Sequence, residues 1–300
     1  MPAELHCHSF YSIDGWISPE EIAEQASDAG VTTLSLTDHN CIEGLGRCRT
    51  RAQALGMRFI NGIEFDVKWQ DGDYHVLAFG FDPENERLKE LLACNWRCYE
   101  LNFARWAPVI EQRYGVGLDE LRTALPARYG DRPNPVPNKW FARSYLLERG
   151  IFADHAEALR EMASVGTEAE GHLPADIIWP FAHLDEVVDA VHGAGGITLL
   201  AHVGGARHGD LEGQLRLIHE MMDAGVDGFE LYHRANTVQE HFHELESAAK
   251  RLGCPVSGGS DAHSHPRHAR SSIGRVEVPD WVVETIDAKI AQRRRGRTLL

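Results

Sequence analysis

Two histidines near the start of the sequence have the types and spacing to bind a metal ion. His6 and His8 lie in residues 3–8, a short segment typical of a β-strand. Side chains alternate between the two faces of a strand, so both imidazoles point to the same side. Burying two unpaired histidines is unfavourable, and a shared cation removes that cost. On its own this spacing is a modest signal, because such pairs are more often structural.

Histidines and carboxylates also occur at or near the ends of other predicted strands. The chain holds 17 histidines, and histidine is the commonest metal ligand in proteins. The further candidates are Asp38, His39, Glu64, His75, His202, Asp261 and His263. Loops at one rim of a β/α barrel build its active site, so we expect these groups to lie together. Imidazole and carboxylate ligands suit Mn, Fe or Zn, whereas Mg and Ca prefer oxygen alone.

The elements that must position these groups follow a repeated pattern. A helical segment, a glycine, a short apolar strand and a polar residue recur, as in AGVTTLSLTDH and AGVDGFELYH. Glycine commonly ends a helix, and β-branched runs favour strands. The pattern predicts strands at residues 3–8, 33–37, 58–62, 74–80, 197–202, 228–232 and 255–260. We therefore predict an α/β fold with seven parallel strands in a (β/α)7 barrel; an open doubly wound sheet is the alternative.

The first helix is predicted to begin at Ser18. Ser18 is a suitable N-cap, Pro19 suits the first helical position, and Glu21 completes a capping box.

Residues 94–180 interrupt the barrel pattern. They separate the fourth and fifth predicted strands and are too long for an ordinary loop. Their apolar residues recur with helical spacing. We predict a first barrel part at residues 1–93, a helical cap inserted at 94–180 and a second barrel part at 181–300. The cap is expected to lie over the rim where such barrels build their sites.

Charge and composition limit the functional classes. The formal net charge is −15, which argues against a stable nucleic-acid partner, because long nucleic acids bind through Lys and Arg. No stretch approaches the roughly 20 apolar residues of a membrane span, and the first residues lack the basic and apolar regions of a signal peptide. We expect a cytoplasmic protein with no membrane partner. The six cysteines form no CxxC pair and are interpreted as reduced thiols.

The segments HCHSFYSIDG, LTDHN, GIEF, HVLAF, LLAHVGG and GGSDAHSH, in that order, resemble the PHP (polymerase and histidinol phosphatase) family. The resemblance covers the chain outside the predicted cap, and the ordered set is highly specific. It implies a distorted seven-stranded barrel, two to three divalent metals, with Mn favoured, and phosphoesterase activity. Similar enzymes with a helical insertion include nucleoside-bisphosphate phosphatases and phosphodiesterases of phosphoribose cyclic phosphate.

The resemblance also implies a trinuclear metal centre. Its ligands would be His6, His8, Glu64 and Asp261 at the first site, His75 and His202 with bridging Glu64 at the second, and Asp14, His39 and His263 at the third. From the residues alone Asp14 stays open, because SIDGW is also typical of a turn. Asp38 is expected to orient a ligand, with helix capping as the alternative.

Clustered metals suit the hydrolysis of phosphate esters. A hydroxide held on the metals would attack phosphorus directly, without a covalent phosphoenzyme. Glu64 and Asp14 would act in catalysis through the metals, and His233 is a candidate proton donor or a structural histidine. Because Arg and Lys match phosphate oxygens, the candidate substrate-binding residues are Lys139, Arg143, Arg207 and Arg234, for which surface solvation is the alternative.

The sequence leaves the substrate open among small phosphate monoesters, cyclic diesters and nucleotides. Related phosphatases often carry Arg-x-His where this chain has Asn138-Lys139-Trp140, which argues against a nucleoside bisphosphate. One alternative function is a 5′-3′ exonuclease on short RNA or DNA. Another is an amidohydrolase-type C–N hydrolase, although YHVLAFG lacks the lysine that often bridges metals in that class. The last is a non-catalytic metal-binding module.

Overall fold

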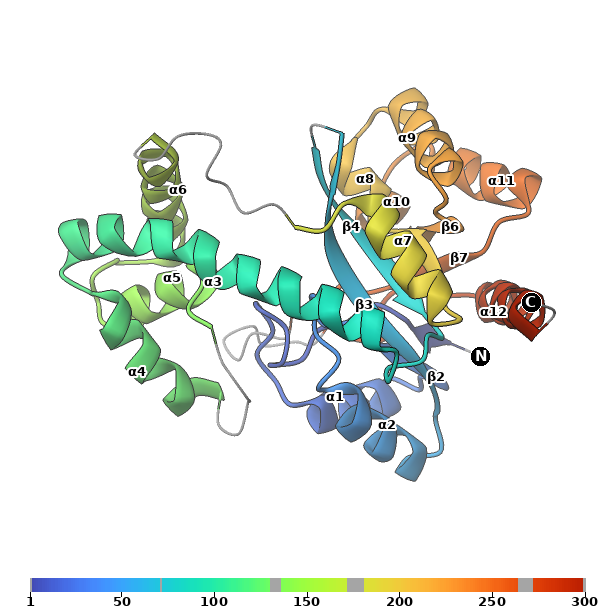
Figure 1. The fold of residues 1–300 in the computed structure, drawn as a ribbon, viewed down its shortest axis with the longest axis horizontal. Coiled ribbons are helices and arrows are strands. Elements are labelled where there is room, and N and C mark those ends of the chain that lie inside the picture. Colours follow the sequence, from blue (N-terminus) through green and yellow to red (C-terminus); the bar gives the residue numbers. More distant parts are fainter. Residues whose placement is uncertain (1, 71, 130–135, 172–180, 264–271, 299–300) are drawn as a thin grey trace. The chain divides into compact units, whose positions relative to one another are not determined.

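The chain folds as two compact units (Figure 1). A computed structural model describes residues 2–70, 72–129, 136–171, 181–263 and 272–298. The first unit comprises Met1–Ala93 and Ala182–Leu300, and the second comprises Cys94–Phe181.

The first unit is built on one seven-stranded sheet in the order β1 to β7. Its strands are β1 (Ala3–Glu4), β2 (Thr33–Leu36), β3 (Arg58–Trp69), β4 (Gly72–Phe79), β5 (Ile197–Leu200), β6 (Gly228–His233) and β7 (Val256–Gly259). The first and last strands also meet, because Leu5 N donates to Gly258 O at 3.1 Å. The sheet is thus nearly closed, and the predicted seven-stranded α/β barrel is confirmed.

The prediction that all strands are parallel is wrong at β4. β4 pairs antiparallel with both β3 and β5, whereas the other neighbouring strands pair parallel. The cause is a tight hairpin: β3 continues to Trp69, well past its predicted end, and Trp69 pairs with Gly72.

The reversed direction of β4 brings its first half to the rim where the parallel strands end. His75 pairs with Asp66 on β3, and its carbonyl accepts a hydrogen bond from Ala201 N, just after β5, at 3.0 Å. A histidine early in β4 therefore lies beside residues that come late in or after the neighbouring strands.

Helices pack against this sheet. They are α1 (Pro19–Asp28), α2 (Leu45–Ala54), α7 (Leu184–Gly193), α8 (Val203–Ala206), α9 (Leu211–Asp223), α10 (Arg234–Thr237), α11 (Phe242–Leu252) and α12 (Asp280–Thr298). α1 and α2 lie side by side next to β2 and β3 (Figure 1). The predicted capping box of α1 is confirmed, because Ser18 accepts from Glu21 N and the Glu21 side chain accepts from Ser18 N. Large side chains such as Phe65, Phe79 and Phe229 are fully buried in the core.

The second unit is helical in its described residues. It contains most of α3 (Glu86–Tyr114), which begins in the first unit, and α4 (Leu118–Tyr129), α5 (Lys139–Glu148) and α6 (His155–Gly171). α5 begins after Asn138, whose side chain accepts from Phe141 N at 2.8 Å. Among the described residues of both units, no helix combines the length and apolarity needed to cross a bilayer.

Candidate metal centre

Four donor atoms from β3 and from the segments after β1 and β7 meet at the rim of the barrel. His6 Nε2 lies 3.0 Å from Glu64 Oε2 and 3.4 Å from Asp261 Oδ1. His8 Nε2 lies 3.2 Å and 3.1 Å from the same two oxygens. Donors about 2.0–2.1 Å from a tetrahedral cation are about 3.3–3.4 Å from one another. The four atoms therefore fit one shared cation.

Glu64 links this group to a second one. Its other oxygen, Oε1, lies 3.0 Å from His75 Nδ1 and 3.2 Å from His202 Nε2, and the two ring nitrogens are 3.1 Å apart. The Glu64 side chain is only 1% exposed. Each oxygen of one buried carboxylate thus faces a different set of histidines, which fits the bridging position that the family resemblance implies.

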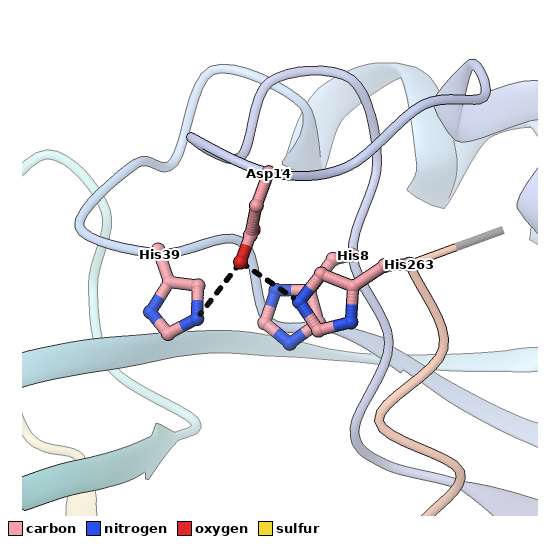
Figure 2. A group of neighbouring side chains, drawn as sticks. All are labelled: His8, Asp14, His39 and His263. Carbon is pink, nitrogen blue, oxygen red and sulfur yellow. Dashed lines mark ion pairs between the residues drawn. The ribbon is translucent and has the colours of Figure 1, made fainter. Parts of the chain in front are cut away.

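A third group contains Asp14, His39 and His263, with His8 beside them (Figure 2). Asp14 reaches toward the rings of His39 and His263 (Figure 2), and its Oδ2 lies 3.9 Å and 3.1 Å from their Nε2 atoms. His8 stacks on both rings, with centroid distances of 4.8 Å to His39 and 4.3 Å to His263. His39 Nε2 also lies 3.3 Å from Glu64 Oε2, so the three groups form one continuous cluster.

Opposite charges shift the pKa values within this buried cluster. Burial lowers the pKa of His6, but the carboxylates of Glu230 and Glu64 outweigh it and hold the pKa well above its usual value. Burial raises the pKa of Glu64, but His6 and His39 outweigh it, so this pKa lies well below its usual range. Without a cation, His6 therefore holds a proton that a bound cation would displace.

Three of the four described non-glycine residues with positive φ lie at this rim. They are Asn40 at 46°, His202 at 28° and Asp261 at 52°. They follow β2, β5 and β7, whereas the fourth, Gln70, lies in the β3–β4 hairpin. This backbone region costs a non-glycine residue about 1–3 kcal/mol and persists only where the surroundings enforce it. Strain of this kind concentrates at functional sites.

Every residue predicted as a metal ligand lies in one of the three groups. Asp38 accepts hydrogen bonds from Ser9 N at 2.5 Å and Ser9 Oγ at 2.7 Å, and so fixes the segment that follows His8. His233 borders the cluster: its Nε2 is buried 3.6 Å from Asp261 Oδ2 and makes no hydrogen bond with any residue that the structure describes.

The predicted substrate-binding residues lie outside these three groups. Arg207 and Arg234 are exposed residues that follow α8 and begin α10. Lys139 and Arg143 belong to α5 in the second unit. Their roles stay predictions.

Two carboxylates that were not predicted from the sequence contact ring nitrogens of the clustered histidines. Glu230 Oε1 on β6 lies 2.8 Å from His6 Nδ1, and Asp66 Oδ1 on β3 lies 3.1 Å from His75 Nε2. Two signals were available in the sequence. One is a carboxylate inside the apolar run GFELYH, and the other is an acid two residues after Glu64 and hence on the same strand face.

Known proteins share both the sequence pattern and the length of this chain. The PHP domain family matches residues 4–174. A 3′,5′-nucleoside bisphosphate phosphatase of Chromobacterium violaceum is 29% identical over 278 residues, 91% of each chain. A 5′-3′ exoribonuclease of Haemophilus influenzae is 26% identical over 87% of this chain and 89% of its own. A phosphoribosyl 1,2-cyclic phosphate 1,2-diphosphodiesterase of Eggerthella lenta is 26% identical over 88% and 94%.

Solved structures share the fold. A candidate metal-dependent phosphoesterase of Bifidobacterium adolescentis is 25% identical, with a TM-score of 0.78 over 96% of this chain and 98% of its own. An amidohydrolase of Chromobacterium violaceum with bound sulfate is also 25% identical, with a TM-score of 0.74 over 98% and 97%. Because the family match spans more than half of the chain and includes the histidine and carboxylate segments of β1 to β4, this chain belongs to the PHP family.

Proposed function

We propose that this PHP-family hydrolase of phosphoric esters acts on small phosphate monoesters or cyclic diesters of nucleotides or sugars. The observation that carries the proposal is the buried Glu64 carboxylate, whose two oxygens face two donor groups with separations of 3.0–3.2 Å. Phosphoryl transfer depends on neutralising the phosphoryl oxygens and aligning the attacking oxygen. Adjacent cations linked by one carboxylate suit both needs.

The donor set supports two to three divalent cations. The cations would be held by His6, His8, Glu64 and Asp261, by Glu64, His75 and His202, and by Asp14, His39 and His263. Mixed imidazole and carboxylate donors suit Mn, our preferred metal, as well as Fe and Zn. When bound, such cations supply a water that loses its proton near neutral pH and positive charge that neutralises the phosphoryl group.

His233 is our candidate for a hydrogen-bond donor to the leaving group. Its Nδ1 accepts a hydrogen bond from Ala235 N at 3.1 Å. The neutral ring therefore carries its proton on Nε2, the atom that faces Asp261. In this tautomer Nε2 can donate a hydrogen bond to an oxygen of the leaving group but cannot bind a metal, which favours a contact with the leaving group over a further ligand.

The inserted helical unit is proposed as a cap that helps to bind the substrate phosphate. Arg143 is half-buried, burial lowers the pKa of its guanidinium, and its Nε has no hydrogen-bond partner among the described residues. A phosphate oxygen would supply such a partner. Lys139 from the same helix, and Arg207 and Arg234 from the segments after β5 and β6, are the other proposed phosphate contacts.

Phosphate release from a panel of esters tests the proposal. The panel holds a nucleoside bisphosphate, a mononucleotide, a phosphoribose cyclic phosphate and a short RNA, each incubated with Mn²⁺. We expect turnover of a small ester that is lost in His8→Ala and falls about 10–1000-fold in Arg143→Ala, because each phosphate contact stabilises the transition state. If protein with measured bound metal releases no phosphate from any member, the proposed function is wrong.

Exonuclease action on short oligonucleotides is the second candidate. It is favoured by the similarity to the Haemophilus influenzae exoribonuclease over most of both chains. The net charge of −15 favours very short substrates, because long strands need cationic surface. Stepwise release of mononucleotides from a short RNA, with no turnover of the small esters, would establish this function instead.

The name of one structural relative raises amide hydrolysis as a further alternative. β4 has the sequence GDYHVLAF, without a lysine to bridge metals, and Glu64 occupies the bridging position. We therefore expect no turnover of an amide panel under conditions that hydrolyse the phosphate ester.

A further inference from the structure

In two proposed histidine ligands, the ring nitrogen that points away from the donor groups contacts a carboxylate. These two carboxylates take no part in the three donor groups. His6 turns Nε2 toward Glu64 and Asp261, and its Nδ1 lies 2.8 Å from Glu230 Oε1. His75 has the opposite arrangement: Nδ1 faces Glu64, and Nε2 lies 3.1 Å from Asp66 Oδ1. The Glu230 side chain is fully buried.

We propose that Glu230 and Asp66 are positioning residues that select the ring nitrogen with which His6 and His75 bind metal. The inference rests on the metal sites of the proposed function. An ionised carboxylate only accepts hydrogen bonds, so the ring nitrogen facing it carries the proton and the opposite nitrogen is left to bind a cation. His6 therefore binds through Nε2, whereas His75 binds through Nδ1.

The second oxygen of each carboxylate accepts a hydrogen bond from a residue that follows a strand and has a positive φ. Glu230 Oε2 accepts from His202 N at 2.8 Å, and Asp66 Oδ2 accepts from Asn40 Nδ2 at 2.6 Å. Both donor residues have positive φ, 28° at His202 and 46° at Asn40. His202 is itself a proposed ligand, and Asn40 follows the proposed ligand His39. Glu230 thus contacts both the His6 ring and the residue His202 with positive φ. Asp66 likewise contacts both the His75 ring and the residue Asn40 with positive φ.

Replacing either carboxylate by its amide removes one of these two contacts. Glu230→Gln and Asp66→Asn keep the side-chain size but turn one acceptor oxygen into an NH₂ donor. If the new amide oxygen accepts from His202 N, its NH₂ faces His6 Nδ1. That nitrogen must then accept, and the ring proton moves to Nε2, where it blocks metal binding. If the amide is turned around, the backbone N–H of His202 faces another donor.

Metal binding by the full chain tests the inference. Metal-free wild type, Glu230→Gln and Asp66→Asn are titrated with Zn²⁺ against a competing chelator, and bound metal is counted by elemental analysis. Loss of a group that orients a ligand histidine typically weakens metal binding by about 10–100-fold, and we expect this at one site in each variant. ¹⁵N NMR of the Zn²⁺-loaded wild type should show His6 protonated at Nδ1 and His75 protonated at Nε2.

Asp227→Asn is the matched control. Asp227 is also a buried carboxylate held by a histidine and a backbone N–H, with His192 Nε2 at 2.8 Å and Thr198 N at 3.0 Å. It lies outside the donor groups, so its amide variant should bind Zn²⁺ like the wild type.

The outcomes separate the inference from the function on which it rests. A wild-type chain that binds no Zn²⁺ would overturn the metal sites themselves. Unchanged Zn²⁺ affinity in both amide variants of a metal-binding wild type would overturn only the positioning role. If a variant does not fold, the ring protonation of the wild type decides, and a proton on His6 Nε2 or His75 Nδ1 refutes the inference.

Discussion

Asp14→Asn in the metal-free protein tests the electrostatics of the third donor group. Asp14 Oδ2 lies 3.1 Å from His263 Nε2. Burial lowers the pKa of His263, but the charge and contact of Asp14, with smaller contributions from Asp261 and Glu64, outweigh it and raise the pKa to about 9. Asparagine keeps the shape of the side chain and removes the charge. The pKa of His263 should therefore fall toward its ordinary value near 6.5.

The size of the effect follows from this pKa difference. Raising the pKa of a histidine from about 6.5 to about 9 corresponds to about 3 kcal/mol, at about 1.36 kcal/mol for each pKa unit. The His263 side chain is 31% exposed, so solvent screening reduces the contribution of the pair to about 1–2 kcal/mol. We expect Asp14→Asn to lower the free energy of unfolding by this amount near pH 6.

The stabilisation that protonated His263 provides should be lost as the pH rises. The pKa of His263 is higher in the folded state than in the unfolded state, so the folded state binds the proton more tightly. The stabilisation is complete below about pH 6.5, the unfolded value, and is lost as the pH rises through about 9. The difference between wild type and Asp14→Asn should shrink over that range.

Two measurements check this prediction in protein kept metal-free by a chelator. NMR titration follows the His263 ring from pH 5 to pH 10, and urea unfolding at pH 6 and pH 9.5 gives the free energies. Asp227→Asn serves as the control for the NMR titration, because Asp227 contacts His192 and not His263. An unchanged pKa of His263 in Asp14→Asn, or a stability difference that grows with pH, would refute the reasoning.

Three further predictions concern metal binding and stability. His8→Ala should lower Mn²⁺-dependent phosphate release at least about 100-fold, since it removes a donor 3.1–3.2 Å from two carboxylates of the first group; steady-state kinetics measure this. Cation binding should release protons and weaken as the pH falls, because the metal-free protein holds the pKa values of His6 and His75 above their usual range; calorimetry in two buffers of different ionisation enthalpy measures the protons. Asp227→Asn should lower the free energy of unfolding by about 2–4 kcal/mol at neutral pH, because it leaves Arg293 without its buried carboxylate partner. Although burial raises the pKa of Asp227, its contacts with His192, Thr198 N and Arg293 outweigh this and lower it, so the loss should disappear as the pH falls below about 4; urea unfolding between pH 3 and pH 7 checks both.

Most residues of the donor groups could be identified from the sequence because their signals are local, whereas Asp14 was assigned only through the family resemblance. His6 and His8 share a strand face through the period-two alternation of strands. Most of the other candidates stand at or just after strand ends, and strand ends can be recognised from apolar runs and the glycines before them. The capping box at Ser18 was equally local, and the structure contains it.

The direction of β4 could not be predicted from the sequence and became known only from its pairing with β3 and β5. The sequence showed a strand at residues 74–80, but a short apolar strand pairs in either direction, and the register with β3 is set over Gly62–Trp69. The error did not displace His75, because the start of an antiparallel strand reaches the same rim as the end of a parallel one.

The sequence by itself determined which residue types stand at the strand ends, and hence that cations and phosphate esters were the chemistry to expect. Only the tertiary structure decided which atoms face each other. Glu230 lies 224 residues from its partner His6, and Asp66 reaches His75 only because a hairpin lays β4 along β3. Local pattern carries no information about such long-range pairs. They form because a buried carboxylate and a buried ring N–H each need a hydrogen-bond partner once the barrel has excluded water.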